Sequence, residues 1–382
     1  MPLDERSKKI AGDLFKRYYE KAELPIESIN EREFGFGDFE KKIAFRHYSF
    51  KDPAALKRYL VENAPAFASY SSSLYKYPDA RPMEKKLWKG SGLIFDLDAS
   101  DLHLKCQTEH GRSWVCQNCL DSVKREAIKL MEDFLMPDFG FSKNEIGINF
   151  SGNRGYHVHV NSKEIFLLNS QQRKSISDYI AGANIDITRF FPTLGMKGKR
   201  LVGPKPSDFG WGGKLANAMV SALNKGVDSL TSLGIDPKIA RKLAASKADV
   251  IFGITTGNWD KVNIPKKAEF WSNVMSRVAI AQSDSIDKNV TNDIHHLIRI
   301  PGTIHGDTGL AGKVIPHASL DAFDPMKDAI VFRQGVMKIQ TDKVPAFVMH
   351  GEQYGPYDNQ TLELPVYAAM YLVLKRVARP VD

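Results

Sequence analysis

Strand-like patterns occur before and after a helical pattern that occupies the middle of this 382-residue chain. In the first half, SGLIFDLDAS predicts a short buried strand that ends in acidic residues, and GINFSGNRGYHVHV predicts a strand, a glycine-rich turn and a second strand. From about residue 171 to residue 246 the apolar residues recur at helical spacing instead. A strand pattern resumes near His295. A single core must therefore be assembled from two segments that lie far apart in the sequence.

This order of patterns predicts an α/β (α+β) fold. We expect a mixed-sheet core formed by residues 1–170 and 250–382, with a Cys/His-rich loop at residues 103–120, and a mostly helical inserted subdomain at residues 171–249. Further helices are expected near the N-terminus, over residues 53–62 and 119–134, and after Pro365, which is typical of the start of a helix.

Composition excludes several classes of protein. The chain is 43% hydrophobic and 26% charged, which is typical of a globular protein and not of a disordered or fibrous one. Its longest strongly apolar run, Val366–Leu374, is far shorter than the ~20 residues that span a bilayer. We therefore expect an intracellular, cytoplasmic protein without a membrane partner. The net charge of +8 permits a polyanionic partner but does not identify one.

Two carboxylates share one face of the predicted acidic strand. In IFDLD, alternation places Asp96 and Asp98 on the same side, roughly 6–7 Å apart, while Phe95 and Leu97 point the other way. Such a pair repels unless a cation lies between them, and Mg²⁺ and Mn²⁺ prefer oxygen ligands. With a third carboxylate, the arrangement suits two-metal phosphoryl transfer. A solvated strand end is the alternative, and Asp101 is expected on the opposite face or in the loop.

All three cysteines fall within fourteen residues. Cys106, His110, Cys116 and Cys119 give the pattern C-x3-H-x5-C-x2-C, which is typical of tetrahedral zinc. Since the chain has no fourth cysteine, a histidine must complete the set; His110 fits best and His103 is the alternative. Four protein ligands leave no open position, so we expect a structural zinc ion.

The turn between the two predicted strands is rich in hydrogen-bond donors. It reads SGNRGYH and begins at Ser151. Glycines let a backbone approach an anion closely, and the side chains of Ser151, Arg154 and His157 offer donors that suit a triphosphate. A glycine-rich hairpin without a ligand explains this motif about equally well.

A second acidic segment, DKNVTNDIHHLIRIPGTIHGDTGL, begins at Asp287. Imidazole and basic side chains follow the carboxylate closely, as expected beside a charged phosphate; they are His295, His296, Arg299 and His305. Asp284 and Asp293 are rival acids. Taken alone, the segment is equally typical of a polar surface loop.

Together these motifs resemble the catalytic (small) subunit of the archaeal and eukaryotic type of DNA primase. The order is a hydrophobic FDxD strand, a zinc loop, SGxRGxH, and a D-x-x-V-T segment that ends in R-x-P-x-x-h-H-x-x-T-G, with h a hydrophobic residue. Here the motifs read IFDLD, Cys106 to Cys119, SGNRGYH and DKNVTNDIHHLIRIPGTIHGDTG. The pieces REFGF, RHYSF and LELPVYAAMYLVL extend the likeness over nearly the whole chain.

The resemblance implies template-directed joining of ribonucleotides, and also of deoxyribonucleotides, on single-stranded DNA. It implies that Asp96, Asp98 and Asp287 hold two Mg²⁺ or Mn²⁺ ions. It also implies that the incoming nucleoside triphosphate is held by Ser151, Arg154, His157, Arg299 and His305. The zinc site, with Cys106, His110, Cys116 and Cys119, looks like the archaeal form. The family usually shows Ser-Gly-Arg-Arg-Gly in the turn, whereas this chain has Asn153 at the first arginine.

The resemblance also implies a partner, the iron–sulfur-containing large regulatory subunit of a heterodimeric primase, and association with the nucleoid if the source is archaeal. Two other readings share some of these features. A stand-alone primase-polymerase of repair or end joining would have the same carboxylates and basic turn. A zinc-stabilised nucleic-acid-binding protein without activity would not need an intact Asp96, Asp98 and Asp287.

Overall fold

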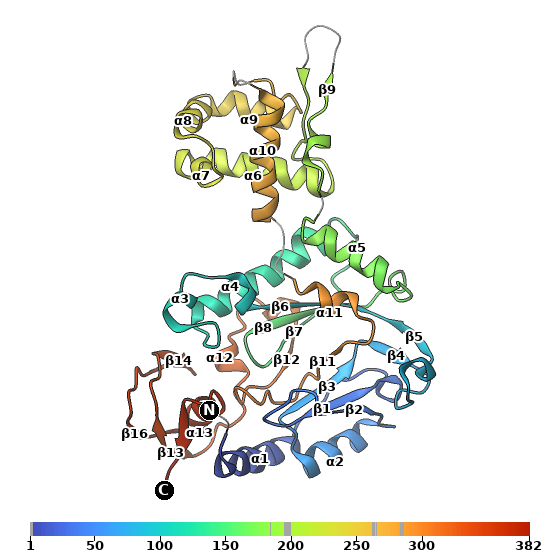
Figure 1. Ribbon diagram of the computed structural model, residues 1–382, viewed down its shortest axis with the longest axis vertical. Coiled ribbons are helices and arrows are strands. Elements are labelled where there is room, and N and C mark those ends of the chain that lie inside the picture. Colours follow the sequence, from blue (N-terminus) through green and yellow to red (C-terminus); the bar gives the residue numbers. More distant parts are fainter. Residues whose placement is uncertain (1–2, 184, 195–199, 262–263, 265, 283–285) are drawn as a thin grey trace. The chain divides into compact units, whose positions relative to one another are not determined.

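The computed structural model of the chain describes residues 3–183, 185–194, 200–261, 264, 266–282 and 286–382 (Figure 1). It mixes helices and sheets, as predicted. The chain divides into two compact units: unit 1 is Met1–Ile128, Phe141–Lys174 and Ser285–Asp382, and unit 2 is Lys129–Gly140 and Ser175–Asp284. Unit 2 therefore has different bounds from the insertion expected at residues 171–249, because it continues to residue 284 and includes a short earlier segment.

Unit 1 is built around two antiparallel four-stranded sheets. The first has the order β12-β7-β8-β6 and consists of β6 (Leu93–Asp98), β7 (Ile146–Phe150), β8 (Gly155–Val160) and β12 (Lys313–Ile315). The second has the order β11-β3-β1-β2 and consists of β1 (Phe34–Gly37), β2 (Phe45–Tyr48), β3 (Phe67–Ser71) and β11 (Leu297–Arg299). The strands predicted in SGLIFDLDAS and GINFSGNRGYHVHV are confirmed.

The C-terminal part of the chain contributes one strand to each of these sheets. β11 pairs with β3, with Arg299 opposite Ser69, and β12 pairs with β7, with Lys313 opposite Phe150. Figure 1 shows these late strands lying beside strands from the first half of the chain. The core thus reunites two distant segments, as the order of sequence patterns predicted.

Two early helices pack near the second sheet in Figure 1, α1 (Glu5–Tyr19) and α2 (Pro53–Asn63). Each has an aspartate cap: Asp4 accepts a hydrogen bond from Ser7 N at 2.6 Å, and Asp52 accepts one from Ala55 N at 2.8 Å. Such caps satisfy amide donors that have no partner within the helix.

The other elements of unit 1 flank these sheets. The helices are α3 (Gln107–His110), α4 (Gln117–Lys129), α11 (Lys288–Asn292), α12 (Pro325–Asp328) and α13 (Val366–Leu374). The remaining strands are β4 (Ser73–Tyr75), β5 (Trp88–Ser91), β13 (Val336–Thr341), β14 (Phe347–Met349), β15 (Glu352–Tyr354), β16 (Thr361–Pro365) and β17 (Ala378–Pro380). The C-terminal helix α13 begins directly after Pro365, as predicted, and almost all of its side chains are buried.

Unit 2 is mostly helical. Its first segment includes the π-helical turn Leu130–Leu135, and its elements continue with the end of α5 (Ser170–Ile180), β9 (Thr193–Leu194), β10 (Arg200–Leu201), α6 (Gly210–Lys225), α7 (Val227–Ser232), α8 (Pro237–Ala245), α9 (Lys247–Thr255) and α10 (Lys267–Gln282). The apolar stripe predicted for the middle of the chain lies on α6, where Leu215, Met219 and Leu223 are fully buried. Among the described residues, no helix combines the length and hydropathy that a membrane span requires.

A buried carboxylate, Glu33, holds together the edge of the second sheet. Its side chain has no exposed surface and pairs with Arg46 at 2.8 Å and with Lys86 at 3.6 Å; Lys86 is itself fully buried. Glu33 also accepts a hydrogen bond from the backbone of His47 at 3.2 Å. Burial lowers the pKa of Lys86, which Glu33 opposes. The carboxylate therefore neutralises a cation that has no access to solvent.

We predict that Glu33→Gln lowers the free energy of unfolding by about 3–5 kcal/mol, because it leaves Lys86 buried without a counter-charge. Glu31→Gln is the matched control: Glu31 forms a more exposed pair with Lys89, which is worth less than about 1 kcal/mol. Urea unfolding of both variants measures the difference. Equal losses in the two variants would contradict the role assigned to Glu33.

Candidate active site and metal cluster

Strand β6 presents two carboxylates on one face. Phe95 and Leu97 are fully buried, whereas Asp96 and Asp98, which alternate with them, keep 29% and 31% of their side-chain surface exposed. Across the β6–β8 ladder, Asp96 lies opposite His157 and Asp98 lies opposite Gly155. The pairing therefore brings the acidic strand against the SGNRGYH turn.

The structure places Asp287 beside this strand. Asp287 precedes α11, and its backbone N–H donates to the Asp96 carbonyl at 2.9 Å. One turn later, Thr291 Oγ1 donates to the carbonyl of Ile94 at 2.8 Å. These two bonds fix the start of α11 along β6.

The rival acids are placed differently. Asp293 is exposed and accepts a hydrogen bond from His295 N at 2.8 Å within its own turn. Asp101 is exposed in the 3-10 turn after β6, in agreement with its expected position in the loop. Asp284 lies outside the described residues. Among the described acids of this segment, Asp287 is therefore the one whose backbone forms a hydrogen bond with the carboxylate strand β6.

The three carboxylates interact electrostatically. The pKa of Asp96 rises from its ordinary 3.8 to about 7, first because burial disfavours the charged form and then because of repulsion by Asp98 and Asp287. Carboxylate oxygens that repel one another are a donor set that fits a hard divalent cation, since its charge would relieve the repulsion. The residues present therefore fit Mg²⁺ or Mn²⁺.

The SGNRGYH turn is tied together by its first serine. Ser151 Oγ accepts the amides of Asn153 and Gly155 at 3.3 and 3.2 Å. Gly152 has φ +83°, and a Cβ there would lie 3.1 Å from Gly312 N and from His305 Cβ. Glycine is required both by the left-handed backbone and by this close approach of the 305–312 loop.

Arg154 bridges the turn and the acidic strand. Its Nε donates to the two carboxylate oxygens of Asp98 at 2.7 and 3.0 Å, and its Nη1 donates to the Arg112 carbonyl at 3.1 Å. His157 Nε2 lies 3.6 Å from Asp96 Oδ1, and burial lowers the pKa of His157 well below 6.5, so its imidazole is neutral. His157 therefore contacts the carboxylate opposite it in the ladder, and Arg154, which directly precedes β8, contacts Asp98.

Arg299 and His305 add donors from the second segment. Arg299 Nη1 is buried and has no hydrogen-bond partner among the described residues, while its guanidinium lies 5.2 Å from the ring centre of Phe67. Burial lowers the pKa of Arg299 to about 10, so it stays charged. His305 Nδ1 accepts the Asp307 amide at 3.2 Å, which places the proton of the neutral ring on Nε2. An unpartnered buried donor beside a second donor is expected where an anion binds.

Sequence reasoning missed two further cations, Lys42 and Lys375. The pKa of His305 is lowered well below 6.5, first by burial and then by the positive charges of Arg299, Lys42, Lys375 and Arg154. Lys42 lies between β1 and β2, and Lys375 caps the C-terminal end of α13. Neither belongs to a chemical motif; the only available signal was the position of Lys375 directly after a strongly apolar helix.

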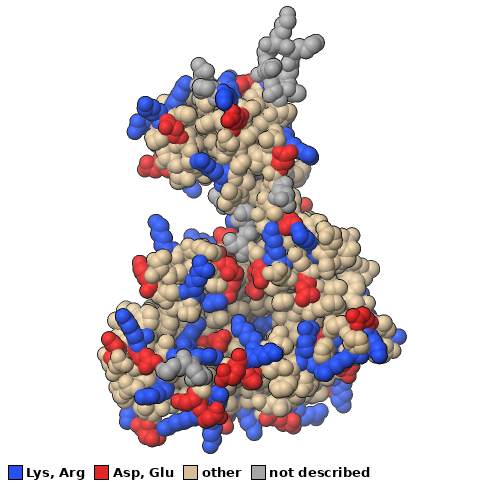
Figure 2. Space-filling view, viewed as in Figure 1, with Lys and Arg blue, Asp and Glu red and all other residues tan. Residues whose placement is uncertain are grey.

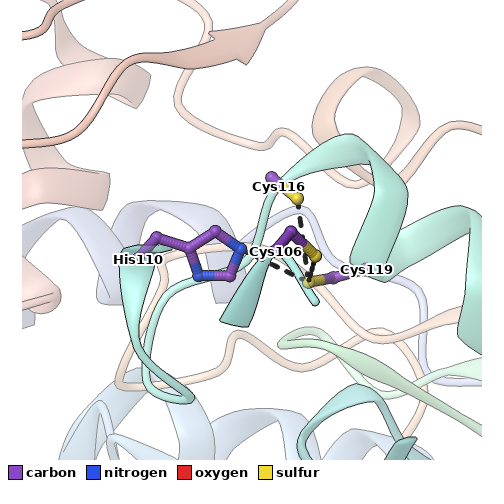
Figure 3. Close-up of side chains that lie close together, drawn as sticks. All are labelled: Cys106, His110, Cys116 and Cys119. Carbon is purple, nitrogen blue, oxygen red and sulfur yellow. Dashed lines mark hydrogen bonds between the residues drawn. The ribbon is translucent and has the colours of Figure 1, made fainter. Parts of the chain in front are cut away.

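The predicted Cys/His cluster is assembled in the structure. Suitable atoms of Cys106, His110, Cys116 and Cys119 all lie within 4.8 Å of one another (Figure 3). Cys119 Sγ is 3.5 Å from Cys106 Sγ, 3.7 Å from Cys116 Sγ and 3.6 Å from His110 Nε2. Tetrahedral zinc, with bonds of about 2.3 Å to sulfur and 2.0 Å to nitrogen, places its ligand atoms about 3.5–3.8 Å apart. The cluster therefore fits a zinc ion.

The two candidate histidines both bond through Nδ1 to a backbone carbonyl, and they differ in where the remaining nitrogen, Nε2, is placed. His110 Nδ1 donates to the Gly111 carbonyl at 2.8 Å, which directs Nε2 toward the three sulfurs. His103 is exposed and bonds through Nδ1 to the Asp101 carbonyl at 2.6 Å. The structure brings His110, and not His103, into the cluster.

The net positive charge is dispersed over the face shown in Figure 2, where basic and acidic side chains are interspersed. The cations that lower the pKa of His305 come from four separate segments of unit 1.

Comparison with known proteins identifies the family. Residues 95–315 match the family described as "DNA primase small subunit". Proteins named DNA primase small subunit PriS are similar over nearly their full length: the chain is 34% identical to that of Methanothrix thermoacetophila (95% of this chain, 96% of the relative). It is 31% identical to that of Methanosarcina acetivorans (98% and 97%) and 28% identical to that of Nitrosopumilus maritimus (98% and 99%).

The chain belongs to the DNA primase small-subunit family.

The mixed fold is of the primase type. The region that matches the primase small subunit begins at Phe95, within the carboxylate strand, and ends at Ile315, within β12. It contains every site residue that the sequence predicted. Lys42 and Lys375 lie outside it.

We predict that His110→Ala removes the bound metal and His103→Ala retains it, because only His110 directs a nitrogen at the three sulfurs. Metal analysis of the purified protein should give one zinc per chain for the wild type and for His103→Ala. His110→Ala should also melt at a lower temperature, since a structural metal contributes folding free energy directly. Zinc-free wild-type protein, or zinc retained by His110→Ala, would contradict this assignment.

We also predict a pH-dependent stability in protein that holds zinc but has been freed of Mg²⁺ and Mn²⁺. The folded state retains the Asp96 proton to about pH 7, whereas the unfolded state releases it near 3.8. The free energy of unfolding should therefore fall by about 2–4 kcal/mol as the pH rises from 4 to 7. In Asp96→Asn this fall should disappear, and in Asp101→Asn most of it should remain. Denaturant unfolding at a series of pH values measures both.

Proposed function

We propose that this chain is the catalytic subunit of a DNA primase that synthesises short RNA primers, and also DNA primers, on single-stranded DNA for replication. The reaction is template-directed nucleotidyl transfer with two Mg²⁺ or Mn²⁺ ions. The observation that carries the proposal is the approach of the Asp96–Asp98 strand to Asp287 and to the basic SGNRGYH turn, in a chain of the primase small-subunit family.

Asp96, Asp98 and Asp287 would hold the two catalytic ions. When bound, these ions activate the attacking 3′-hydroxyl and stabilise charge during the in-line displacement at the α-phosphate. The protein contributes the fixed carboxylates: the Asp287–Asp96 backbone bond sets their spacing, and the buried Phe95 and Leu97 hold β6 in place. The raised pKa of Asp96 supports this role, because a cation there would relieve the cost of ionising it.

The incoming triphosphate would be held by Ser151, Arg154, His157, Arg299 and His305. Ser151 shapes the turn, and Arg154 would exchange part of its contact with Asp98 for a phosphate oxygen. Arg299 offers a charged donor that has no partner among the described residues, and His305 offers its Nε2–H. Preorganised donors of this kind stabilise the charge that develops during phosphoryl transfer.

The cluster of Cys106, His110, Cys116 and Cys119 would hold a structural Zn²⁺. It would fix the loop whose Arg112 carbonyl accepts from Arg154. The ion would therefore support the phosphate grip without entering the reaction.

The proposed partners are the iron–sulfur-containing large primase subunit, the single-stranded DNA template and nucleoside triphosphates, and the proposed location is the cytoplasm at the nucleoid. The end-to-end similarity to proteins named as small subunits supports a heterodimer. The test is a primer-synthesis assay on single-stranded DNA with labelled ribonucleotides and each metal, with and without the large subunit. Co-purification with a ligase or helicase alone would favour the repair-type primase-polymerase.

We predict that Asp96→Ala or Asp98→Ala lowers primer synthesis at least a hundredfold, because each removes an oxygen donor for the catalytic ions. Asp101→Ala is the control and should stay within threefold of the wild type. Circular dichroism and binding to single-stranded DNA should be unchanged in all three variants. Near-normal synthesis by either variant of β6 would contradict the proposed mechanism.

A further inference from the structure

Lys375 reaches the phosphate-binding turn from the opposite end of the chain. It caps the C-terminal end of α13, and its Nζ lies 3.4 Å from Asn153 Oδ1 in the SGNRGYH turn and 3.2 Å from the Ser113 carbonyl in the Cys/His loop. The ammonium therefore sits where these two segments meet.

Both oxygen atoms that accept hydrogen bonds from this ammonium are uncharged. Among the described residues, no carboxylate lies within 4.0 Å of Nζ, which lies 5.7 Å from the centre of the buried Tyr371 ring. Desolvation and the neighbouring Arg154 lower the pKa of Lys375 to about 8. Placing a second cation beside Arg154 without an ion pair is unfavourable. A bound anion at this position would offset that cost.

The surrounding charges define what kind of anion fits. Arg154, Arg299, Lys42 and Lys375 all act on His305. Asp98 and Asp307 are the carboxylates that act on Lys375. Four cations are more than a singly charged anion needs. A polyphosphate chain carries several charges and can contact several of these cations at once.

We propose that Lys375 binds a phosphate group of the incoming nucleoside triphosphate, next to Arg154. This rests on the proposed function and adds to it a contact from the C-terminal helix, outside the motifs that predicted the site. The proposal also gives a role to Asn153, the residue at which the turn departs from Ser-Gly-Arg-Arg-Gly. The small amide side chain of Asn153 leaves space for the Lys375 ammonium from α13. An arginine at position 153 would place its own charge close to where this ammonium lies.

The test measures binding of ATP and of AMP to the full-length protein, by fluorescence competition, for Lys375→Gln and for the double variant Asn153→Arg with Lys375→Gln. Lys375→Gln should weaken ATP binding about tenfold or more, since a hydrogen bond to a charged group is lost. AMP binding should change less than threefold. The double variant should recover ATP affinity to within threefold of the wild type. Lys9→Gln, on the exposed side of α1, is the control and should bind both nucleotides normally.

Zinc content and melting temperature are measured on the same samples. If Lys375 only fastens the Cys/His loop to the turn, Lys375→Gln weakens ATP and AMP equally and Asn153→Arg restores neither; that result overturns the proposal. So does unchanged ATP affinity in Lys375→Gln. If the variants behave as expected but the wild type synthesises no primer, the nucleotide contact stands and the proposed primase activity fails.

Discussion

Repulsion among three partly buried carboxylates is the constraint on which the rest of this site depends. The β6–β8 ladder and the hydrogen bond from Asp287 N to the Asp96 carbonyl fix the backbones that carry Asp96 and Asp287, and after burial the charges of Asp98 and Asp287 raise the pKa of Asp96. Without a bound cation the arrangement is unfavourable, as the raised pKa of Asp96 indicates. Arg154 compensates part of this cost through Asp98. A site that is unfavourable when empty and neutralised when filled is well suited to binding metal ions and charged substrates.

The Cys/His cluster is linked to the same region through backbone carbonyls. Arg112 and Ser113, which lie between His110 and Cys116, accept hydrogen bonds from Arg154 and Lys375. These carbonyls can orient two cations only if the loop has a fixed conformation. Buried Trp114, which packs against Phe347 and Tyr371, holds one side of this loop, and a metal in the Cys/His cluster would add rigidity on the other side. Under the proposed function, the cluster would support phosphate binding by fixing this loop.

The elements that the sequence predicted well are those with strong local signals. Alternation in IFDLD predicted which side chains of β6 point together, and the spacing of Cys106, His110, Cys116 and Cys119 predicted the cluster. The bounds of unit 2 were not predicted, because its division from unit 1 depends on which helices pack together and not on any break in the helical pattern. Glu33 and Lys86 gave no signal either, since a buried ion pair resembles two surface residues in the sequence.

The sequence by itself determined the chemistry of the chain: a same-face carboxylate pair, a Cys/His ligand set, a donor-rich turn and an ordered resemblance to primase small subunits. Each of these depends on residues that are neighbours along the chain. The tertiary structure decided which distant groups join them. It selected Asp287 over Asp293, it selected His110 over His103, and it brought Lys42 and Lys375 into the field around His305. The reason is physical: electrostatic interactions act through space, and only the packing of sheets and helices fixes those distances.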